Sequence, residues 1–227
     1  MTSPIIVALD SNPKEALNLA QKLDPKDCNL KVGSQLFTLA GPEIIKNLNE
    51  LGFNIFLDLK FHDIPNTVRK SVEASMELGV WMLNVHASGG TDMLKAASEA
   101  LKGAQNKPIL LGVTILTSID QQVLNKIGFR HNLEDQVFLL AEQCQKMGLD
   151  GIVCSPNELP ALRKRFNEEF LLVCPGIRSN EEDKDDQKRT STPSSAIKMG
   201  ADFLVIGREI TRDKNPTDRV RNILQKV

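Results

Sequence analysis

FLDLKFHDIPNT, residues 56–67, is an apolar run that becomes charged halfway along. Because side chains alternate across a strand, Asp58 and Lys60 should point to one face and their leucine and phenylalanine neighbours to the other. Pro65 ends the extended backbone and can open a helix, since its missing N–H is not needed in a first turn. An acid and a lysine at a strand end can form an ordinary surface ion pair. The apolar flanks favour instead a buried strand, in which such charges are costly unless they are paired.

Similar apolar runs recur along the chain and alternate with longer amphipathic segments. We expect eight strands, over residues 5–9, 29–32, 54–60, 81–86, 109–114, 151–154, 170–174 and 202–206. We expect helices over residues 12–22, 41–51, 65–78, 88–101 (with Ser88 as the cap), 133–147 and 157–166, and from about 215 onwards. Strands that alternate with helices are typical of parallel βα units, and eight such units favour a closed (β/α)8 TIM barrel. We therefore predict one catalytic barrel domain over residues 1–227; an α/β doubly wound open sheet is the alternative.

The overall composition narrows the class of protein. At 227 residues the chain can bury the core of one large domain. Its formal net charge of −1 does not indicate binding to nucleic acid or to an anionic membrane surface. No apolar run approaches the roughly 18 residues of a membrane span, and the N-terminus lacks the pattern of a signal peptide. The four cysteines show no C-x-x-C spacing, which is typical of reduced thiols, so we expect a soluble cytoplasmic protein.

Polar residues gather where the predicted strands end. They are Asp10, Lys31, Asp58, Lys60, His86, Thr114, Thr117, Ser118, Pro175, Arg178, Gly207 and Arg208. Each has an ordinary explanation when taken alone: Asp10 could cap a helix, and His86 could be a hydrogen-bonded core histidine. The carboxyl ends of parallel strands meet at one rim of a barrel, however, and barrel enzymes place their chemistry at that rim. We therefore expect these side chains to form one site.

Two segments of this rim indicate a phosphate-bearing ligand. Gly207 and Arg208 follow the last predicted strand, where barrels commonly bind phosphate through backbone N–H groups and a guanidinium. An ordinary turn is the alternative at that position. Residues 176–195 form a long polar segment, which is either a solvated surface loop or a lid that closes over the ligand.

The charges of Lys31, Asp58, Lys60 and Asp63 alternate in sign, so the four can be buried together as a network. In such a network Lys60 would remain an ammonium that is able to give a proton. The sequence contains no His-x-His, H-E-x-x-H or cysteine cluster, and the lysines occupy the places that a divalent cation would take. It also lacks the glycine-rich motifs of nucleotide cofactor sites. We therefore expect neither a metal nor a cofactor.

Residues 58–67 match, without a departure, the D-x-K-x-x-D-I-P-x-T signature of the orotidine 5′-phosphate decarboxylases, and the chain resembles that family over essentially its whole length. The resemblance implies that Asp10 contacts a ribose and that Lys31 is the lysine of the second strand. It also implies substrate contacts at Asp58, Lys60, Asp63, Ile64, Thr67, Thr117, Ser118, Pro175, Arg178, Gln187, Gly207 and Arg208. Lys188 is the alternative to Gln187 if the register of that loop differs.

By this resemblance, the protein would convert orotidine 5′-phosphate to UMP and CO2 without a cofactor. It would act as a homodimer in which Asp63 enters the neighbouring site, and Lys31, Asp58, Lys60 and Asp63 would be its catalytic residues. Lys60 would stabilise and then protonate the carbanion left at C6 of the pyrimidine. Asp58 would face the departing carboxylate, and would either repel that group or hold Lys60 in place. Binding of the phosphate would drive closure of the 176–195 loop.

Two other classes of function remain open from the sequence. A metal-dependent sugar-phosphate decarboxylase or aldolase of the same barrel type could use the D-x-K-x-x-D frame with Mg²⁺ on the rim acids. The continuation HDIPNT at residues 62–67 favours the pyrimidine enzyme. A non-catalytic barrel that binds a phosphate ligand would keep Gly207 and Arg208 but would not need a lysine between two acids.

Overall fold

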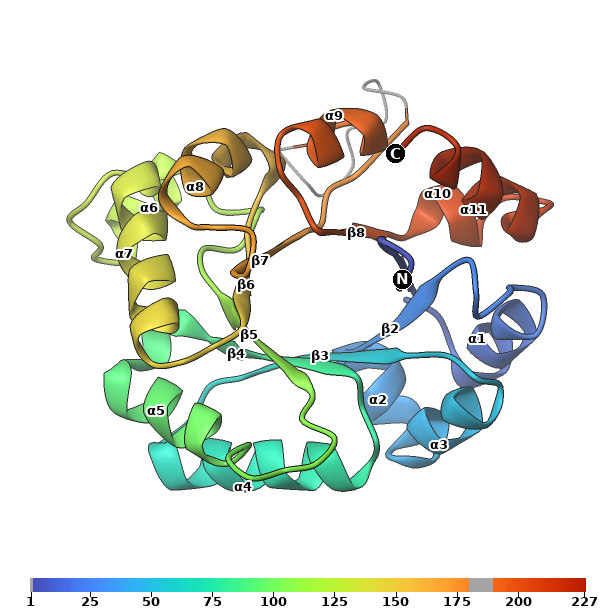
Figure 1. The fold of residues 1–227 in the computed structure, drawn as a ribbon, viewed down its shortest axis with the longest axis horizontal. Helices are drawn as coiled ribbons and strands as arrows, with labels where there is room; N and C mark the ends of the chain where they lie inside the picture. The colour runs from blue at the N-terminus through green and yellow to red at the C-terminus, as the bar shows by residue number, and fades with distance from the viewer. Residues whose placement is uncertain (1, 180–189) are drawn as a thin grey trace.

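The eight predicted strands close into a barrel. In the computed structural model, which describes residues 2–179 and 190–227, neighbouring strands are parallel and follow the order of the chain, and the last strand pairs with the first. The strands are β1 (Ile5–Ala8), β2 (Asn29–Gly33), β3 (Ile55–Phe61), β4 (Met82–His86), β5 (Ile109–Val113), β6 (Gly151–Val153), β7 (Leu171–Cys174) and β8 (Phe203–Ile206). Figure 1 shows this ring of strands from one end. The prediction of a (β/α)8 barrel is confirmed, and the pairing of β8 with β1 excludes the open sheet.

Helices surround the barrel on its outside (Figure 1). The main ones are α1 (Pro13–Ala20), α3 (Glu43–Glu50), α4 (Pro65–Glu77), α5 (Thr91–Glu99), α7 (Leu133–Lys146), α8 (Leu159–Arg165) and α11 (Pro216–Leu224). Shorter elements lie between them: α2 (Ser34–Ala40), α6 (Gln121–Lys126), α9 (Pro193–Lys198) and α10 (Arg208–Thr211), with the 3-10 turns η1 (Ala87–Gly89) and η2 (Pro156–Glu158). Within residues 2–179 and 190–227, no helix has both the length and the apolar character that crossing a membrane requires.

The short helices α2, α6, α9 and α10 were not predicted from the sequence. Helix α2 follows β2 directly, because Gly33 is both the last strand residue and the N-cap of the helix. No turn residue therefore separates the two elements. Helix α9 begins at Pro193, inside the segment that the sequence predicted as a loop to Ser195. The Thr192 side chain caps α9 by accepting a hydrogen bond from the backbone N–H of Ser195, at 3.3 Å.

The predicted start of the helix after β4 is wrong. Ser88 does not cap it; Ser88 lies within the 3-10 turn η1, and α5 begins at Thr91 after Gly90. Gly90 has a φ of 88° and its position offers no side-chain cap. The predicted helix over 157–166 likewise begins as the 3-10 turn η2 before α8 starts at Leu159.

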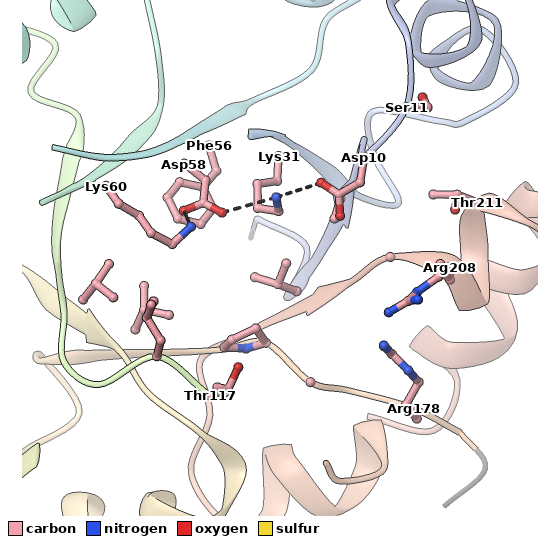
Figure 2. A pocket seen from close by; sticks show the side chains of 18 of the residues that line it. Asp10, Ser11, Lys31, Phe56, Asp58, Lys60, Thr117, Arg178, Arg208 and Thr211 are labelled. Atoms are coloured by element: carbon pink, nitrogen blue, oxygen red, sulfur yellow. Dashed lines mark hydrogen bonds and ion pairs between the residues drawn. The ribbon is translucent and has the colours of Figure 1, made fainter. Parts of the chain in front are cut away.

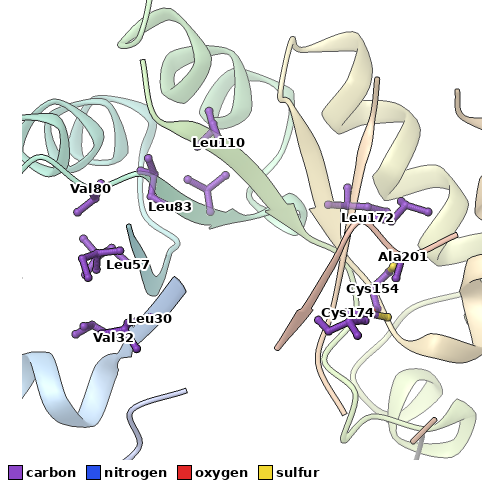
Figure 3. Packing of buried hydrophobic residues seen from close by; sticks show 14 of the residues in the cluster. Leu30, Val32, Leu57, Val80, Leu83, Leu110, Cys154, Leu172, Cys174 and Ala201 are labelled. Atoms are coloured by element: carbon purple, nitrogen blue, oxygen red, sulfur yellow. The ribbon is translucent and has the colours of Figure 1, made fainter. Parts of the chain in front are cut away.

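The barrel has an apolar interior and a larger apolar layer outside it. The inner cluster of buried residues consists of Ile6, Ala8, Phe56, Met82, Leu111, Val173 and Val205. The outer cluster packs the strands against the helices; Figure 3 shows Leu30, Leu57, Leu83, Leu110 and Leu172 among its members. Because Phe56 belongs to the inner cluster and Leu57 to the outer one, the predicted alternation along β3 is confirmed. Asp58 and Lys60 continue the inner face toward the carboxyl end of the strand.

All four cysteines are free, and all are buried. Burial raises the pKa of the Cys144 thiol to about 12, so this side chain is a neutral apolar group of the core at physiological pH. Burial and the neighbouring carboxylate of Asp27 likewise raise the pKa of Cys28 to about 12.

Candidate active site

A cavity of about 700 Å³ opens at the carboxyl ends of the strands. Its lining contains nine of the residues that the sequence singled out: Asp10, Lys31, Asp58, Lys60, Thr117, Pro175, Arg178, Gly207 and Arg208. These come from or directly follow β1, β2, β3, β5, β7 and β8, so the closure of the barrel brings them together. Figure 2 shows the lysines and aspartates along one side of the cavity and the two arginines on another.

Four charged side chains form a continuous chain of ion pairs along this wall. Lys31 Nζ lies 3.2 Å from Asp10 Oδ1 and 3.2 Å from Asp58 Oδ2. Lys60 Nζ lies 2.6 Å from Asp58 Oδ1. The charges alternate, as predicted, but the fourth member within this chain is Asp10 and not Asp63. Each carboxylate oxygen of Asp58 therefore faces a different ammonium group (Figure 2).

Burial and charge compete at the centre of this network. Burial opposes the ionised form of Asp58, but the ammonium groups of Lys31 and Lys60 outweigh that effect and hold the pKa of Asp58 below its usual value. Burial also opposes the charged form of Lys31, but the carboxylates of Asp58 and Asp10 outweigh it and raise the pKa of Lys31. Asp58 is thus an anion and Lys31 a cation at neutral pH, although both are almost fully buried.

The backbone of Lys60 is unusual for a strand residue. Its φ is 53°, and among residues 2–179 and 190–227 no other residue except glycine has a positive φ. The register between β3 and β4 shifts between Leu57 and Phe61, so Lys60 stands at an irregularity in the sheet. The backbone N–H of Lys60 donates to the side-chain Oδ1 of Asn84 on β4, at 2.8 Å.

Asn84 is the site residue that the sequence analysis missed. Its side chain is fully buried, and its Nδ2 donates to Asp58 Oδ1 at 2.7 Å. Asn84 could have been predicted as a functional residue, because it is a polar residue between Leu83 and Val85 of an apolar strand and a buried amide needs hydrogen-bond partners. Residues that do line the cavity and were not predicted include Ser11, Phe56, Ile115, Cys154 and Thr211.

Two arginines mark the other part of the cavity. The side chains of Arg178 and Arg208 point toward the same region, near Thr211 and Ser11 (Figure 2). The backbone N–H of Arg178 donates to Ser191 O at 2.9 Å, which ties the residues after β7 to those before α9. Gln187, the predicted partner of these arginines, lies outside the described residues, as does Lys188.

Between the lysines and the arginines the cavity wall is mostly apolar. Phe56, Val113, Ile115, Val153 and Val205 contribute to it. Thr117 adds a hydroxyl, whereas Ser118 is exposed and does not line the cavity. The cavity thus offers paired charges, an apolar middle and a cationic part, which suits a ligand with an apolar or ring portion and an anionic group.

Several predicted residues lie away from this cavity. Asp63, Ile64 and Thr67 are exposed at the start of α4, and Ile64 keeps 67 % of its surface accessible. Asp63 Oδ1 accepts a hydrogen bond from the backbone N–H of Ile64, at 2.7 Å. Within one chain, the second half of the 58–67 signature therefore does not line the cavity that Asp58 and Lys60 line.

His86 and Thr114 also have roles outside the cavity lining. The ring of His86 stacks at an angle beside that of His62, with 5.2 Å between the ring centroids. Thr114 Oγ1 donates to Val153 O at 3.1 Å and so joins β5 to β6. Neither residue lines the cavity, and His86 is half-buried rather than a core residue.

The two aspartates of the ion-pair chain are already neutralised by lysines. In the part of the chain that the structure describes, no group of three or more histidine, cysteine, aspartate or glutamate side chains is placed to hold a metal ion. Asp10 and Asp58, the two acids of the ion-pair chain, share Lys31 as a partner. An ammonium group thus stands where a cation shared by these carboxylates would bind.

Comparison with known proteins gives a consistent result. The family model described as "Orotidine 5'-phosphate decarboxylase / HUMPS family" matches residues 3–223. A protein of Nitrosococcus oceani named orotidine 5′-phosphate decarboxylase is 53 % identical, over 99 % of this chain and 97 % of its own length. One of the same name from Dichelobacter nodosus is 51 % identical, over 98 % of this chain and 97 % of its own.

Solved structures agree with these relatives. The crystal structure of orotidine 5′-phosphate decarboxylase from Lactobacillus acidophilus superposes with a TM-score of 0.88 at 39 % identity, covering 99 % of this chain and 98 % of that one. A crystal structure of an uncharacterised conserved protein from Geobacillus kaustophilus has a TM-score of 0.84 at 35 % identity and covers 98 % of both chains. The family match spans all eight strands of the barrel, and the chain belongs to the orotidine 5′-phosphate decarboxylase / HUMPS family.

Proposed function

We propose that this protein is a carboxy-lyase of pyrimidine biosynthesis, which converts orotidine 5′-phosphate to UMP and CO2 in the cytoplasm. The observation that carries the proposal is the Asp10–Lys31–Asp58–Lys60 chain of ion pairs in one cavity with Arg178 and Arg208. The names of the similar proteins from Nitrosococcus oceani and Dichelobacter nodosus support the same activity.

Lys60 is the proton donor in this proposal. The bond between C6 of the pyrimidine and the carboxylate carbon breaks, CO2 leaves, and the electron pair stays on C6 in the plane of the ring. The Lys60 ammonium hydrogen-bonds this carbanion and then transfers a proton to it, which leaves UMP and a neutral amine that regains its proton from water. An ammonium fixed at C6 interacts more strongly with the carbanion than with the neutral carbon of the substrate, and that difference lowers the barrier.

Asp58 and Lys31 fix the ammonium in place. Asp58 holds Lys60 Nζ at 2.6 Å, and Lys31 neutralises the second oxygen of the same carboxylate. These contacts favour a positioning role for Asp58, beside any repulsion of the departing carboxylate. The side chain of Asp10 stays 63 % exposed, so it can accept hydrogen bonds from ribose hydroxyls.

Arg178, Arg208 and the backbone at Gly207 bind the phosphate. Two guanidinium groups that point into one part of a cavity can each donate paired hydrogen bonds to a phosphate dianion. Thr117 and the apolar wall contact the pyrimidine ring, with Pro175 beside the ribose and phosphate. Gln187 contributes from the segment that follows Arg178. Residues 176–195 are the predicted lid on this phosphate site, and 180–189 of them fall outside the described residues.

The functional unit is a homodimer in this proposal. Asp63, Ile64 and Thr67 are exposed beside the cavity strand β3 and lie outside the cavity of their own chain. When a second subunit packs on this surface, Asp63 of the first subunit enters the cavity of the second, beside Lys60 of the second subunit. The signature would then contribute its two halves to two different sites.

The direct test is an assay of the purified chain with orotidine 5′-phosphate and excess chelator. We expect the orotate absorbance to disappear and UMP to accumulate at a rate that the chelator does not change. A sugar-phosphate decarboxylase or aldolase that uses Mg²⁺ would lose its activity in chelator. A barrel that only binds ligands would retain UMP and leave orotidine 5′-phosphate unchanged.

A further inference from the structure

One buried amide connects both ends of Lys60 to the same carboxylate oxygen. Asn84 Oδ1 accepts the backbone N–H of Lys60 at 2.8 Å, and Asn84 Nδ2 donates to Asp58 Oδ1 at 2.7 Å. Lys60 Nζ also donates to Asp58 Oδ1, at 2.6 Å. The three residues therefore form a closed ring of hydrogen bonds that begins at the Lys60 backbone and returns to its side chain.

This ring holds a backbone conformation that lysine does not favour. A residue with a Cβ atom is strained in the left-handed region, where Lys60 lies with a φ of 53°. The β3–β4 register shifts at this point, so a side chain rather than a strand carbonyl receives the Lys60 N–H. If that acceptor were missing, the N–H would be left unsatisfied and the residue would be free to relax to an extended conformation.

The chemistry of the position selects an amide. A backbone N–H can only donate and a carboxylate can only accept, so the residue between them must offer one acceptor and one donor on the same group. Asparagine does so without adding charge beside Asp58. A carboxylate at this position would repel Asp58. An apolar side chain would leave the Lys60 N–H without its acceptor and would remove one of the donors to Asp58 Oδ1.

We propose that Asn84 is a positioning residue for the decarboxylation: its single amide fixes the left-handed backbone of Lys60 and the Asp58 oxygen that receives the Lys60 ammonium, and so aims that ammonium at the substrate. This inference rests on the proposed function. Asn84 does not line the cavity and touches no substrate; it acts through Lys60 and Asp58.

The test compares Asn84→Ala and Asn84→Asp with Asn29→Ala. Asn29 is a matched control, because it is also a buried strand asparagine: its Nδ2 donates to Ser3 O and Ile5 O, and its Oδ1 accepts from Asn54. It lies at the start of β2, at the opposite end of the barrel from the cavity. Asn29→Ala therefore reports the loss of a buried amide without a change in the site.

We expect Asn84→Ala to lower kcat about 100-fold, because small displacements of a reacting group have effects of that size. The dissociation constant of UMP should change by less than about threefold, since uniform ligand binding is separate from transition-state positioning. Asn29→Ala should keep the kcat of the unaltered protein, even if its melting temperature falls by as much as that of Asn84→Ala. A kcat of Asn84→Ala that matches that of Asn29→Ala would overturn the inference.

Asn84→Asp gives a second readout in a side chain of the same shape. The new carboxyl group can donate to Asp58 only when it is protonated. The kcat of Asn84→Asp should therefore approach that of the unaltered protein as the pH falls from about 8 to about 6. The charged side chains of Lys31, Asp58 and Lys60 and the imidazole of His86 also surround this position in every variant, so the profile is compared with that of Asn84→Ala. A pH profile parallel to that of Asn84→Ala would overturn the inference. Absence of decarboxylation in the unaltered protein would instead refute the proposed function.

Discussion

Lys60 combines two unfavourable features, a left-handed backbone and a charged side chain that is only 33 % exposed. The backbone conformation costs about 1–2 kcal/mol for a residue with a Cβ atom. The contacts with Asp58 and Asn84 hold the residue in that conformation. Strain at a single position, opposed by several fixed contacts, is typical of residues that must be aimed at a substrate.

This strain can be measured by comparing Lys60→Gly with Lys60→Ala. Both changes remove the ammonium, but only glycine adopts a φ of 53° without strain. We expect Lys60→Gly to be more stable than Lys60→Ala by about 1 kcal/mol in urea unfolding. At Leu59, which has no positive φ, the alanine variant should be more stable than the glycine variant, because glycine loses more backbone entropy on folding. A more stable alanine variant at both positions would contradict the strained backbone.

The residues of the site were predictable where they broke the apolar pattern at strand ends. Asp10, Lys31, Asp58, Lys60 and Arg208 did so, and all five line the cavity. The left-handed φ at Lys60 was not predictable, because neither glycine nor asparagine marks that position. It depends on Asn84, a partner from the next strand, and such partners are fixed only when the strands pair.

At the scale of elements, two glycines allow a close approach, one between two strands of the barrel and one between a strand and a helix. A Cβ atom on Gly151 would lie 2.2 Å from the backbone oxygen of Leu171 on β7. A Cβ atom on Gly112 would lie 2.1 Å from the Sγ of Cys144 on α7. The Leu171 oxygen belongs to the backbone and can move only if strand β7 moves, whereas the Cys144 sulfur is a single side-chain atom that a substitution can remove.

This difference predicts that one glycine substitution can be rescued and the other cannot. Gly112→Ala and Gly151→Ala should each destabilise the protein by about 1–3 kcal/mol through overpacking. Adding Cys144→Ala should recover part of the loss at Gly112, because it removes the obstructing sulfur. It should leave the loss at Gly151 unchanged. Strictly additive unfolding free energies in the Gly112→Ala and Cys144→Ala pair would show that the predicted clash does not limit the packing.

The order of elements followed from the alternation of apolar runs and amphipathic segments, since each strand and each long helix has its own period. The short helices could not be predicted from this pattern, because α10 has four residues and α9 has six, which are too few to show a period of 3.6. The Thr192 cap and Pro193 mark the start of α9 locally, but such a signal is common in turns as well.

At the scale of the whole molecule, the 58–67 signature divides between two places. Asp58 and Lys60 line the cavity, whereas Asp63, Ile64 and Thr67 face outward. The resemblance implied this division, since it assigned Asp63 to the neighbouring site. Residues 62–64, between the end of β3 at Phe61 and the start of α4 at Pro65, carry Asp63 and Ile64 away from the cavity. An exposed isoleucine beside a conspicuous acid favours a surface that a second copy of the chain covers.

Mixing two inactive variants tests this shared site. A dimer of one Lys60→Ala subunit and one Asp63→Ala subunit has one site with both groups intact. Random exchange of equal amounts makes half of the dimers hybrid, so activity should return to about a quarter of that of the unaltered protein. Exchange is verified by copurification of differently tagged subunits. Verified hybrids without activity would contradict a site shared between subunits.

The role of Lys60 is tested most directly by Lys60→Ala in an assay of orotidine 5′-phosphate turnover with excess chelator. The affinity for UMP, measured by calorimetry on the same sample, serves as the control for an intact cavity. We predict that turnover falls more than about 1,000-fold, since the proton donor and the charge at C6 are lost together, while UMP still binds. Turnover that persists in a variant with normal UMP affinity would contradict the account.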